Sequence, residues 1–161
     1  MNIEILYRGF HETPDGKERV YYDGAWHAGE WVEGNLIITR YAIGAPTYEI
    51  ASQWTGEYYF QVKVAPTTVG RYTGLQDKNG RRIFEGDIID MTGEWWGAAG
   101  PAGHDSPICV VEYDPYTCGF DPFATYDCDC GVYINAEGCE VIGNIHDNPE
   151  LIGGVDNGGT A

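Results

Sequence analysis

Basic residues are missing from the last 79 residues of this chain of 161 residues. All 9 lysines and arginines lie at or before Arg82, together with 10 acidic residues, so residues 1–82 have a net charge of −1. Residues 83–161 hold 15 acidic residues and no basic one. Such a surface repels phosphate backbones, and we therefore expect no direct binding of DNA or RNA.

This excess of acidic residues allows three interpretations. It can serve solubility or adaptation to a salty host, or it can dock a basic partner surface, which includes imitation of nucleic acid. It can also hold a divalent cation weakly, although the chain has no loop with the ligand spacing of an EF-hand. The composition leaves these interpretations open.

Long apolar runs and common catalytic motifs are also absent. No run is long enough to cross a bilayer, and no charged and then apolar leader opens the chain, so we expect a cytoplasmic protein without a membrane partner. Neither of the two serines, Ser52 and Ser106, lies in a Gly-x-Ser-x-Gly elbow. The chain has no phosphate loop, dinucleotide fingerprint or His-Glu-x-x-His pair, and its four histidines are isolated. We predict a protein that needs no cofactor and is not an enzyme.

The residues that are present favour an ordered all-β fold. Aromatic residues make up 14% of the chain, and 23 glycines suit many tight turns. Residues 57–64 alternate apolar and polar side chains as a strand does, and no window shows a helical period. Trp31-Val32 and Leu36–Thr39 flank Glu33-Gly34-Asn35, which we interpret as a hairpin. Asn148-Pro149-Glu150, with Asn148 as the cap, allows at most one short helical turn near the C-terminus.

The predicted organisation is two β lobes. Residues 1–68 form an N-terminal β lobe, and residues 69–153 form a C-terminal lobe like a small SH3-like barrel. A loop rich in glycine, alanine and proline spans residues 91–107 and carries Trp95 and Trp96. The two tryptophans mark a possible partner contact, with burial of at least one of them in the core as the alternative. Residues 154–161 are expected to form a disordered tail.

Residues 69–89 combine two tight turns with short strands. Asn79-Gly80 is a strong hairpin signal, because both residues tolerate the positive φ of a type I′ turn. Asp77 can set up this turn by accepting nearby backbone N–H groups. Glu85-Gly86-Asp87 predicts a second turn with Gly86 in a left-handed conformation, and Ile88 starts the next strand.

Three carboxylates lie at these turns: Asp77, Glu85 and Asp87. They could form an acid–base pair or a metal site, which would make the protein a metal-dependent hydrolase. A carboxylate at a turn also satisfies backbone N–H groups, and we favour this architectural interpretation.

The cysteines offer a second candidate site. Cys118, Cys128, Cys130 and Cys139 could converge on zinc across strand ends, but the chain lacks the paired Cys-x-x-Cys knuckles of zinc ribbons. Reduced, partly buried thiols are the preferred interpretation for a cytoplasmic protein, and a disulfide is a further alternative. We predict no bound metal.

Four segments in order along the chain resemble the YopX family of bacteriophage and prophage proteins. They are Ile5-Leu6-Tyr7-Arg8-Gly9, Gly29-Glu30-Trp31-Val32-Glu33-Gly34-Asn35-Leu36-Ile37, residues 69–89, and residues 140–151 from Glu140 to Leu151. The match weakens at residues 91–107 and 116–138, so the tryptophan pair and the additional cysteines are not carried over from the family.

The resemblance implies an all-β, multi-sheet protein of phage or prophage origin, in a bacterial host cell, with no established activity. It marks a set of motif residues as architectural: Tyr72, Thr73, Gly74, Leu75, Asp77, Asn79, Gly80, Ile83, Glu85, Gly86, Asp87, Ile88, Gly143, Asn144, Asn148, Pro149 and Glu150.

From the residues themselves we predict a non-enzymatic accessory protein that works by protein binding. Exposed strand edges or aromatic faces would make it a homo-oligomer. The alternatives are an acidic DNA mimic or host-factor inhibitor, and a metal-dependent hydrolase.

Overall fold

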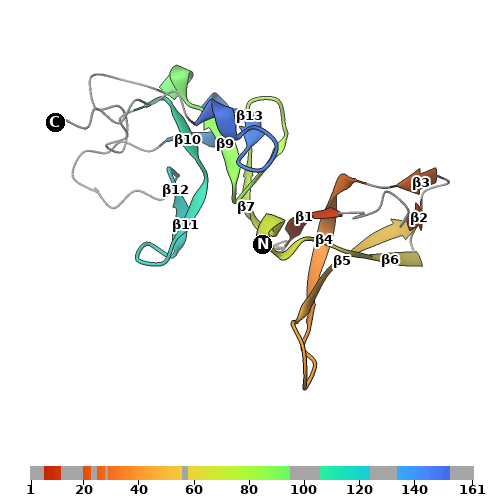
Figure 1. Ribbon diagram of the computed structural model, residues 1–161. Helices are drawn as coiled ribbons and strands as arrows, with labels where there is room; N and C mark the ends of the chain where they lie inside the picture. The colour runs from red at the N-terminus through yellow and green to blue at the C-terminus, as the bar shows by residue number, and fades with distance from the viewer. Residues whose placement is uncertain are drawn as a thin grey trace. The chain divides into compact units, whose positions relative to one another are not determined.

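A computed structural model describes residues 6–11, 20–22, 25–27, 29–55, 58–94, 106–123 and 134–152. The chain divides into two compact units, residues 1–72 and residues 73–161. This division lies four residues after the boundary expected from the sequence and falls within one strand, β7 (Gly70–Gln76). Figure 1 labels the strands of both units.

The first unit is built on one antiparallel sheet. Its strands, in the order β6-β5-β4-β1, are β6 (Tyr58–Lys63), β5 (Thr47–Thr55), β4 (Glu30–Thr39) and β1 (Tyr7–His11), and the start of β7 pairs with β1. β2 (Val20–Tyr22) and β3 (Ala25–His27) form a separate hairpin. A short 3-10 helix, η1 (Pro66–Thr68), leads from β6 to β7.

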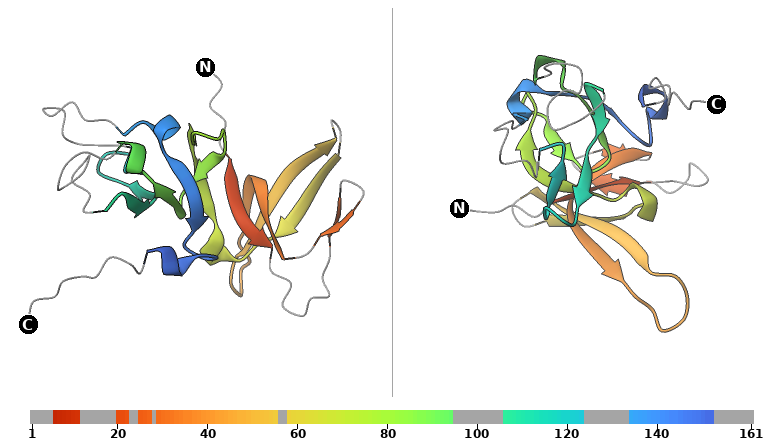
Figure 2. Two further views of the ribbon diagram at one scale, coloured as in Figure 1. Left: turned by 90° about the horizontal axis from the view of Figure 1, so that it is seen from above. Right: turned by 90° about the vertical axis from the view of Figure 1, so that its left-hand side faces the viewer.

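A small apolar cluster supports this sheet. Val32, Ile50 and Val64 are its buried members, with at most 4% of each residue exposed. Val32 comes from β4 and Ile50 from β5, so the cluster joins the two longest strands of the unit. The distal ends of those strands extend away from it as a two-stranded ribbon (Figure 2).

β4 runs unbroken through Gly34, so the hairpin expected at Glu33-Gly34-Asn35 is wrong. A Cβ at Gly34 would overlap the carbonyl oxygen of Ala51 on β5. Glycine is therefore required by the close approach of a neighbouring strand and not by a turn. The chain reverses at residues 40–46, where Gly44 has a φ of 108°.

The second unit consists of short strands. Within it β7 is followed by β8 (Arg82–Phe84), and a three-stranded antiparallel sheet has the order β10-β9-β13, made of β10 (Ile108–Val110), β9 (Asp87–Asp90) and β13 (Glu140–Asn144). A further hairpin joins β11 (Glu112–Asp114) and β12 (Gly119–Asp121). In the described part of this unit, three 3-10 helices lie between or after the strands: η2 (Thr92–Glu94), η4 (Ala136–Gly138) and η5 (Pro149–Leu151).

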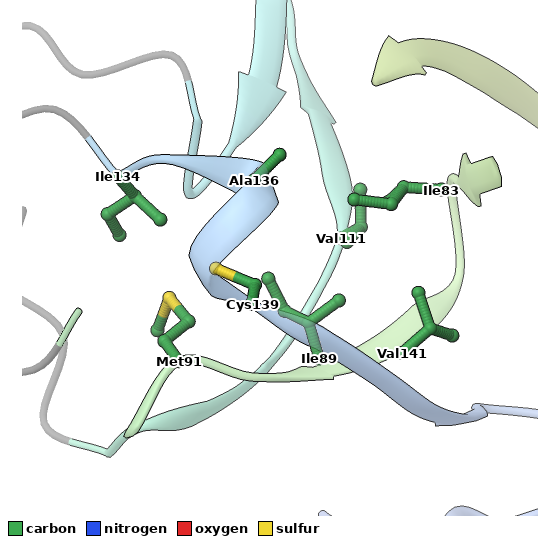
Figure 3. Close-up of a cluster of buried hydrophobic side chains, with 8 residues drawn as sticks. All are labelled: Ile83, Ile89, Met91, Val111, Ile134, Ala136, Cys139 and Val141. Carbon is green, nitrogen blue, oxygen red and sulfur yellow. The ribbon is translucent and has the colours of Figure 1, made fainter. Parts of the chain in front are cut away.

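Eight buried side chains form one apolar cluster in the core of the second unit (Figure 3): Ile83, Ile89, Met91, Val111, Ile134, Ala136, Cys139 and Val141, each at most 6% exposed. β9 is the middle strand of its sheet, with Ile89 opposite Cys109 on one side and Val141 on the other. Ile89 therefore holds the central position in this cluster.

The prediction of an all-β protein is confirmed. The described residues form strands, turns and 3-10 segments of three residues, and they contain no α-helix. The strand expected at residues 57–64 corresponds to β6, and the expected C-terminal helical turn is η5. Within the same residues, no helix has the length and apolar character needed to span a membrane.

Candidate functional site

The first signature turn joins β7 to β8, but its type differs from the expected one. The Gly80 N–H donates to the Asp77 carbonyl at 2.9 Å, so the turn is centred on Lys78-Asn79. In this turn only Gly80 has a positive φ, 77°, which is typical of a type I turn followed by a bulge glycine. The type I′ prediction is wrong because the Asp77 N–H bonds to the Arg81 carbonyl at 2.9 Å, which makes the loop one residue longer.

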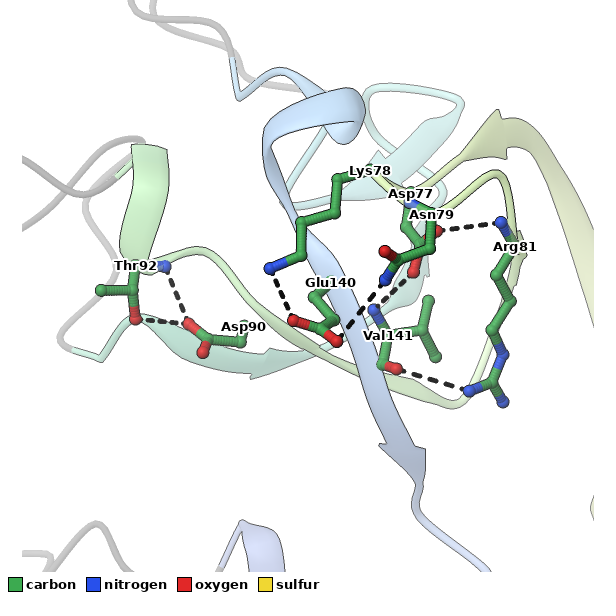
Figure 4. A network of polar contacts seen from close by, with 8 residues as sticks. All are labelled: Asp77, Lys78, Asn79, Arg81, Asp90, Thr92, Glu140 and Val141. Atoms are coloured by element: carbon green, nitrogen blue, oxygen red, sulfur yellow. Dashed lines mark hydrogen bonds and ion pairs between the residues drawn. The ribbon is translucent and has the colours of Figure 1, made fainter.

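The Asp77 side chain organises this loop (Figure 4). It is only 4% exposed, and it accepts the N–H groups of Asn79 at 2.8 Å, Arg81 at 2.9 Å and Val141 at 3.0 Å. Burial raises the pKa of the Asp77 carboxyl, but the three N–H groups and the Arg81 guanidinium outweigh this effect and hold the pKa below its usual value. A carboxylate engaged in this way is a loop organiser, because both of its oxygens already serve as acceptors.

The same hairpin is fastened to β13. The Lys78 N–H donates to the Cys139 carbonyl at 3.0 Å, and the Arg81 guanidinium donates to the Val141 carbonyl at 3.4 Å. Lys78 Nζ also lies 2.6 Å from a carboxylate oxygen of Glu140, and this contact raises the pKa of the Lys78 ammonium. The signature at residues 69–89 and the closing segment at residues 140–151 thus meet in one structural clamp.

The second signature turn forms as predicted, with Gly86 at a φ of 84°. Asp87 is fully buried, and its carboxylate accepts the Phe84 N–H at 2.8 Å. The Gly86 N–H donates to the Val111 carbonyl at 2.8 Å, and the Gly86 carbonyl accepts the Ile145 N–H at 2.9 Å. One residue therefore ties the turn to two segments that lie far along the chain.

The remaining motif residues of the hairpin shape β7 and β8. Thr73 Oγ1 donates to the Ile83 carbonyl at 2.9 Å and accepts the Leu75 N–H at 3.1 Å. Gly74, which lies between Thr73 and Leu75, has a φ of 87°. Ile83 and Ile88 are fully buried, so their role is to fill the core.

The closing segment turns around Asn144. Its side-chain carbonyl accepts the N–H groups of His146 at 2.9 Å and Asp147 at 3.0 Å. Asn148 was predicted to cap the helical turn, but its side chain makes no capping bond. It accepts the Asn144 N–H at 3.4 Å and covers Gly143, where a Cβ would lie 2.5 Å from its oxygen. The capping prediction is wrong because the side chain bonds back to the end of β13.

The described cysteines lie in three different surroundings. Cys139 is fully buried and its Sγ donates to the Asn135 carbonyl at 3.3 Å, and burial raises its pKa to about 11. Cys109 Sγ lies 3.9 Å from Met91 Sδ, and burial raises the pKa of this thiol to about 12. Cys118 is exposed in the turn between β11 and β12. All three described cysteines are free thiols.

The other parts of the zinc and tryptophan hypotheses lie outside the described residues: Cys128, Cys130, Trp95 and Trp96. The same holds for residues 154–161. Within the described ranges, no three side chains of histidine, cysteine, aspartate or glutamate gather as a metal site would require.

An exposed apolar feature of the first unit was missed from the sequence. Residues 35–48, the distal part of the β4–β5 hairpin, form a ribbon that we call the arm (Figures 1 and 2). The described residues include six exposed large apolar side chains, and four of them lie in the arm: Ile37 at 36%, Ile38 at 39%, Tyr41 at 58% and Ile43 at 94%. The Gly44-Ala45-Pro46 turn signal directly after an apolar run would have located it.

Two buried polar side chains of the first unit were also missed. The Arg8 guanidinium lies 4.7 Å from the centre of the Trp31 ring, and only 6% of Arg8 is exposed. His11 is 2% exposed, and its Nδ1 donates to the Lys63 carbonyl at 2.8 Å. These contacts hold β1 against its neighbours and give no sign of catalytic geometry.

Comparison with known proteins identifies the family. The family model described as YopX protein matches residues 15–153. The chain belongs to the YopX family. Within this YopX chain the match includes both the signature and the closing segment, which meet at the Asp77 clamp.

Among the solved structures that are similar to this YopX protein is the crystal structure of protein EF1440 from Enterococcus faecalis. The two chains are 24% identical, with 92% of this chain and 98% of the other covered and a TM-score of 0.39. No curated protein is a significant match.

Proposed function

We propose that this YopX protein is a non-enzymatic accessory protein of phage or prophage origin that works by protein binding, first of all to a second copy of itself. The observation that carries this proposal is the arm. Its exposed isoleucines and tyrosine lie on one projecting ribbon, and exposed large apolar side chains that gather in one element mark interaction sites.

Physical chemistry also argues against an isolated arm. Leu36 and Tyr48 at the base of the arm pack against the buried cluster, but residues 40–46 at its tip are all exposed, and a two-stranded tip of this kind is only marginally stable in water. A protein partner that covers the arm would supply the missing burial.

The candidate catalytic groups support binding over chemistry. Asp77 and Asp87 direct their carboxylates to backbone N–H groups of their own turns. The hydrolase hypothesis needs carboxylates that are free to bind a metal or a substrate, and these two already have structural roles.

Sedimentation velocity over a range of concentrations tests the proposal. We expect the mean sedimentation coefficient to rise with concentration, up to high micromolar protein. A strictly monomeric species throughout that range would contradict self-association.

The charge of the second unit supports a second candidate, an acidic inhibitor that occupies a basic groove of a host factor. Residues 83–161 hold 15 acidic residues and no basic one, and Glu112, Glu137, Asp147 and Glu150 are exposed. Capture of partners from a bacterial lysate at low and high salt separates the candidates. A host partner that is lost as salt rises favours the acidic inhibitor.

A further inference from the structure

The loop between β7 and β8 carries an Asn-Gly pair at its exposed end. Asn79 and Gly80 are both exposed, and a Cβ at Gly80 would meet no atom within 4 Å. In an Asn-Gly pair the backbone nitrogen of the glycine can attack the side-chain amide of the asparagine, because glycine has no side chain to obstruct the approach. Steric hindrance therefore does not protect Asn79, and protection depends on the hydrogen bonds of the loop.

The reaction is a deamidation that needs only water as a second reactant. The Gly80 nitrogen loses its proton and attacks Cγ of Asn79, which forms a new C–N bond. The bond from Cγ to the side-chain nitrogen breaks, and this nitrogen leaves with the proton as ammonia. Water then opens the cyclic imide at either of its carbonyls, so residue 79 becomes aspartate or isoaspartate. No oxidant or reductant takes part.

Asp77 opposes the first step of this reaction. The Gly80 N–H, whose proton must leave, donates to the Asp77 carbonyl at 2.9 Å. On either side of it, the N–H groups of Asn79 and Arg81 donate to Asp77 Oδ1 at 2.8 Å and 2.9 Å. Asp77 thus holds three consecutive amides, and its negative charge lies beside the nitrogen that would have to become an anion. A like charge at this distance disfavours the anion.

The side chain of Asn79 is held from a distant segment (Figure 4). Its Nδ2 donates to Glu140 Oε1 on β13 at 3.5 Å, and the other carboxylate oxygen of Glu140 lies 2.6 Å from Lys78 Nζ. Deamidation would replace this donor with a carboxylate that repels Glu140. Isoaspartate would also lengthen the backbone of the loop by one methylene group. Either product therefore opposes return of the loop to its original contacts.

We propose that Asn79 is a site of spontaneous modification in this chain, and that the Asp77 contacts with residues 79–81 control its deamidation. While these contacts are made, Asn79 persists although it is exposed. A local opening of the loop frees the Gly80 nitrogen, and the reaction then makes a transient opening permanent. The proposal does not depend on self-association or on any partner.

The test follows residue 79 of the full-length protein in mildly alkaline buffer. Peptide mapping by mass spectrometry measures the conversion of the amide to a carboxylate, and chromatography separates the aspartate and isoaspartate products. We expect deamidation in the folded protein to be slower by about tenfold or more than in the urea-unfolded chain, because hydrogen bonds to a charged group must first break. A rate in the folded protein equal to or above that of the unfolded chain would overturn the proposal.

Two substitutions of Asp77 test its role directly. Asp77→Ala removes the charge and the side-chain acceptor, and we expect it to raise the rate at Asn79 by about tenfold. Asp77→Asn keeps an oxygen acceptor and removes the charge, so its rate should lie between those of the wild type and Asp77→Ala. If Asp77→Ala does not fold, as circular dichroism would show, Asp77→Asn decides. An unchanged rate in folded Asp77→Asn would contradict control by the carboxylate.

Ile89→Ala is the control for loss of stability. It empties a fully buried site in the same unit but removes no hydrogen bond of the loop. Its rate at Asn79 should stay closer to that of the wild type than to that of Asp77→Ala. Equal acceleration by Ile89→Ala would show that unfolding of the whole unit controls the reaction, and would overturn control by Asp77.

The chain supplies its own reference, since its second Asn-Gly pair is Asn157-Gly158. This pair lies outside the described residues. Its rate should be the same in the wild type and in the Asp77 variants. A change there that matches the change at Asn79 would overturn the role given to the Asp77 contacts.

Asn79→Asp reproduces one product and tests the consequence of the reaction. We expect hydrogen exchange of the Arg81 and Val141 amides, which both donate to the Asp77 carboxylate, to be about two- to fivefold faster than in the wild type. Unchanged exchange at both amides would contradict the claim that the modified loop stays open.

Discussion

The two units of this protein hold their strands together by different means. The first has strands of up to 10 residues and a buried cluster of three apolar residues. The second has strands of three to five residues beyond β7, yet its buried cluster contains eight. Its turns are also fixed by the buried carboxylates of Asp77 and Asp87. Short strands can form a stable unit when side chains satisfy the backbone groups that the ladders leave unpaired.

Charge separates the two units as well. Residues 1–72 hold 6 basic and 9 acidic residues, whereas residues 73–161 hold 3 basic and 16 acidic ones, so the net charges are −3 and −13. The exposed apolar arm belongs to the less charged unit. The apolar arm and most of the net negative charge therefore belong to different units.

Truncation of one central core residue in each unit should have the largest effect. Ile89→Ala and Ile50→Ala each empty a fully buried site, and we expect each to lower the free energy of unfolding of its own unit by about 2–5 kcal/mol. Hydrogen exchange followed by peptides from each unit measures this. Equal loss of protection in both units from either substitution would show that they unfold as one body.

Removal of the Asp77 carboxylate, which organises the loop between β7 and β8, should have the second-largest effect. Asp77→Ala leaves three backbone N–H groups without their acceptor, and we expect it to destabilise the second unit by about 2–4 kcal/mol in urea unfolding. Asp114→Ala is the control, because the Asp114 carboxylate accepts the Tyr116 N–H at an exposed turn. Equal effects of the two substitutions would contradict the role given to burial.

Low pH should lower the free energy of unfolding of the second unit, because Asp77 becomes protonated. Its pKa is lowered in the folded protein, so its contribution is complete above the unfolded pKa of about 3.9 and is lost as the pH falls through the folded pKa. Below about pH 3.9 the unfolded chain binds the proton first, and the free energy of unfolding of the wild type should therefore decline. Urea titrations between pH 5 and pH 2 of the wild type and Asp77→Asn measure the difference. An equally steep decline in the variant would show that other groups cause it.

The smallest effect is expected from two glycines with positive φ. A Cβ at Gly80 or Gly44 meets no atom within 4 Å, so alanine there introduces only backbone strain. Gly80→Ala should destabilise the second unit by about 1 kcal/mol, because Gly80 closes the turn that is fastened to β13. Gly44→Ala should change the unfolding of the first unit less, since the tip of the arm is exposed and makes no part of the core. Thermal unfolding of both variants checks this order.

Much of the fold could be predicted from local sequence patterns. Alternation found β6, and the glycines of the signature located both turns, because their conformational demands are local. Other features depend on contacts between distant residues. Gly34 was assigned to a turn although it accommodates the backbone of Ala51, and Asn148 was assigned to a cap although its partner is Asn144.

The contacts of the candidate site could likewise be predicted only where they are local in the sequence. The turn positions of Asp77 and Asp87 were recognised as places where carboxylates accept backbone N–H groups. The bond from Val141 to Asp77 spans 64 residues and has no local signature. The exposed arm was missed because its exposure depends on where the strands that flank β4 and β5 end, which no pattern within β4 records.

The central position of β9 has a consequence for synthesis of the chain. One neighbour of β9 is β10, at residues 108–110, and the other is β13, at residues 140–144. The hydrogen bond from the Ile145 N–H to the Gly86 carbonyl likewise cannot form until residue 145 has been synthesised. The ribosome synthesises the chain from the N-terminus, so the first unit is completed early. The sheet of the second unit cannot form completely until almost the whole unit has left the exit tunnel. Chains that stop before residue 140 would leave one side of β9 open, and an apolar strand in that state is prone to aggregate.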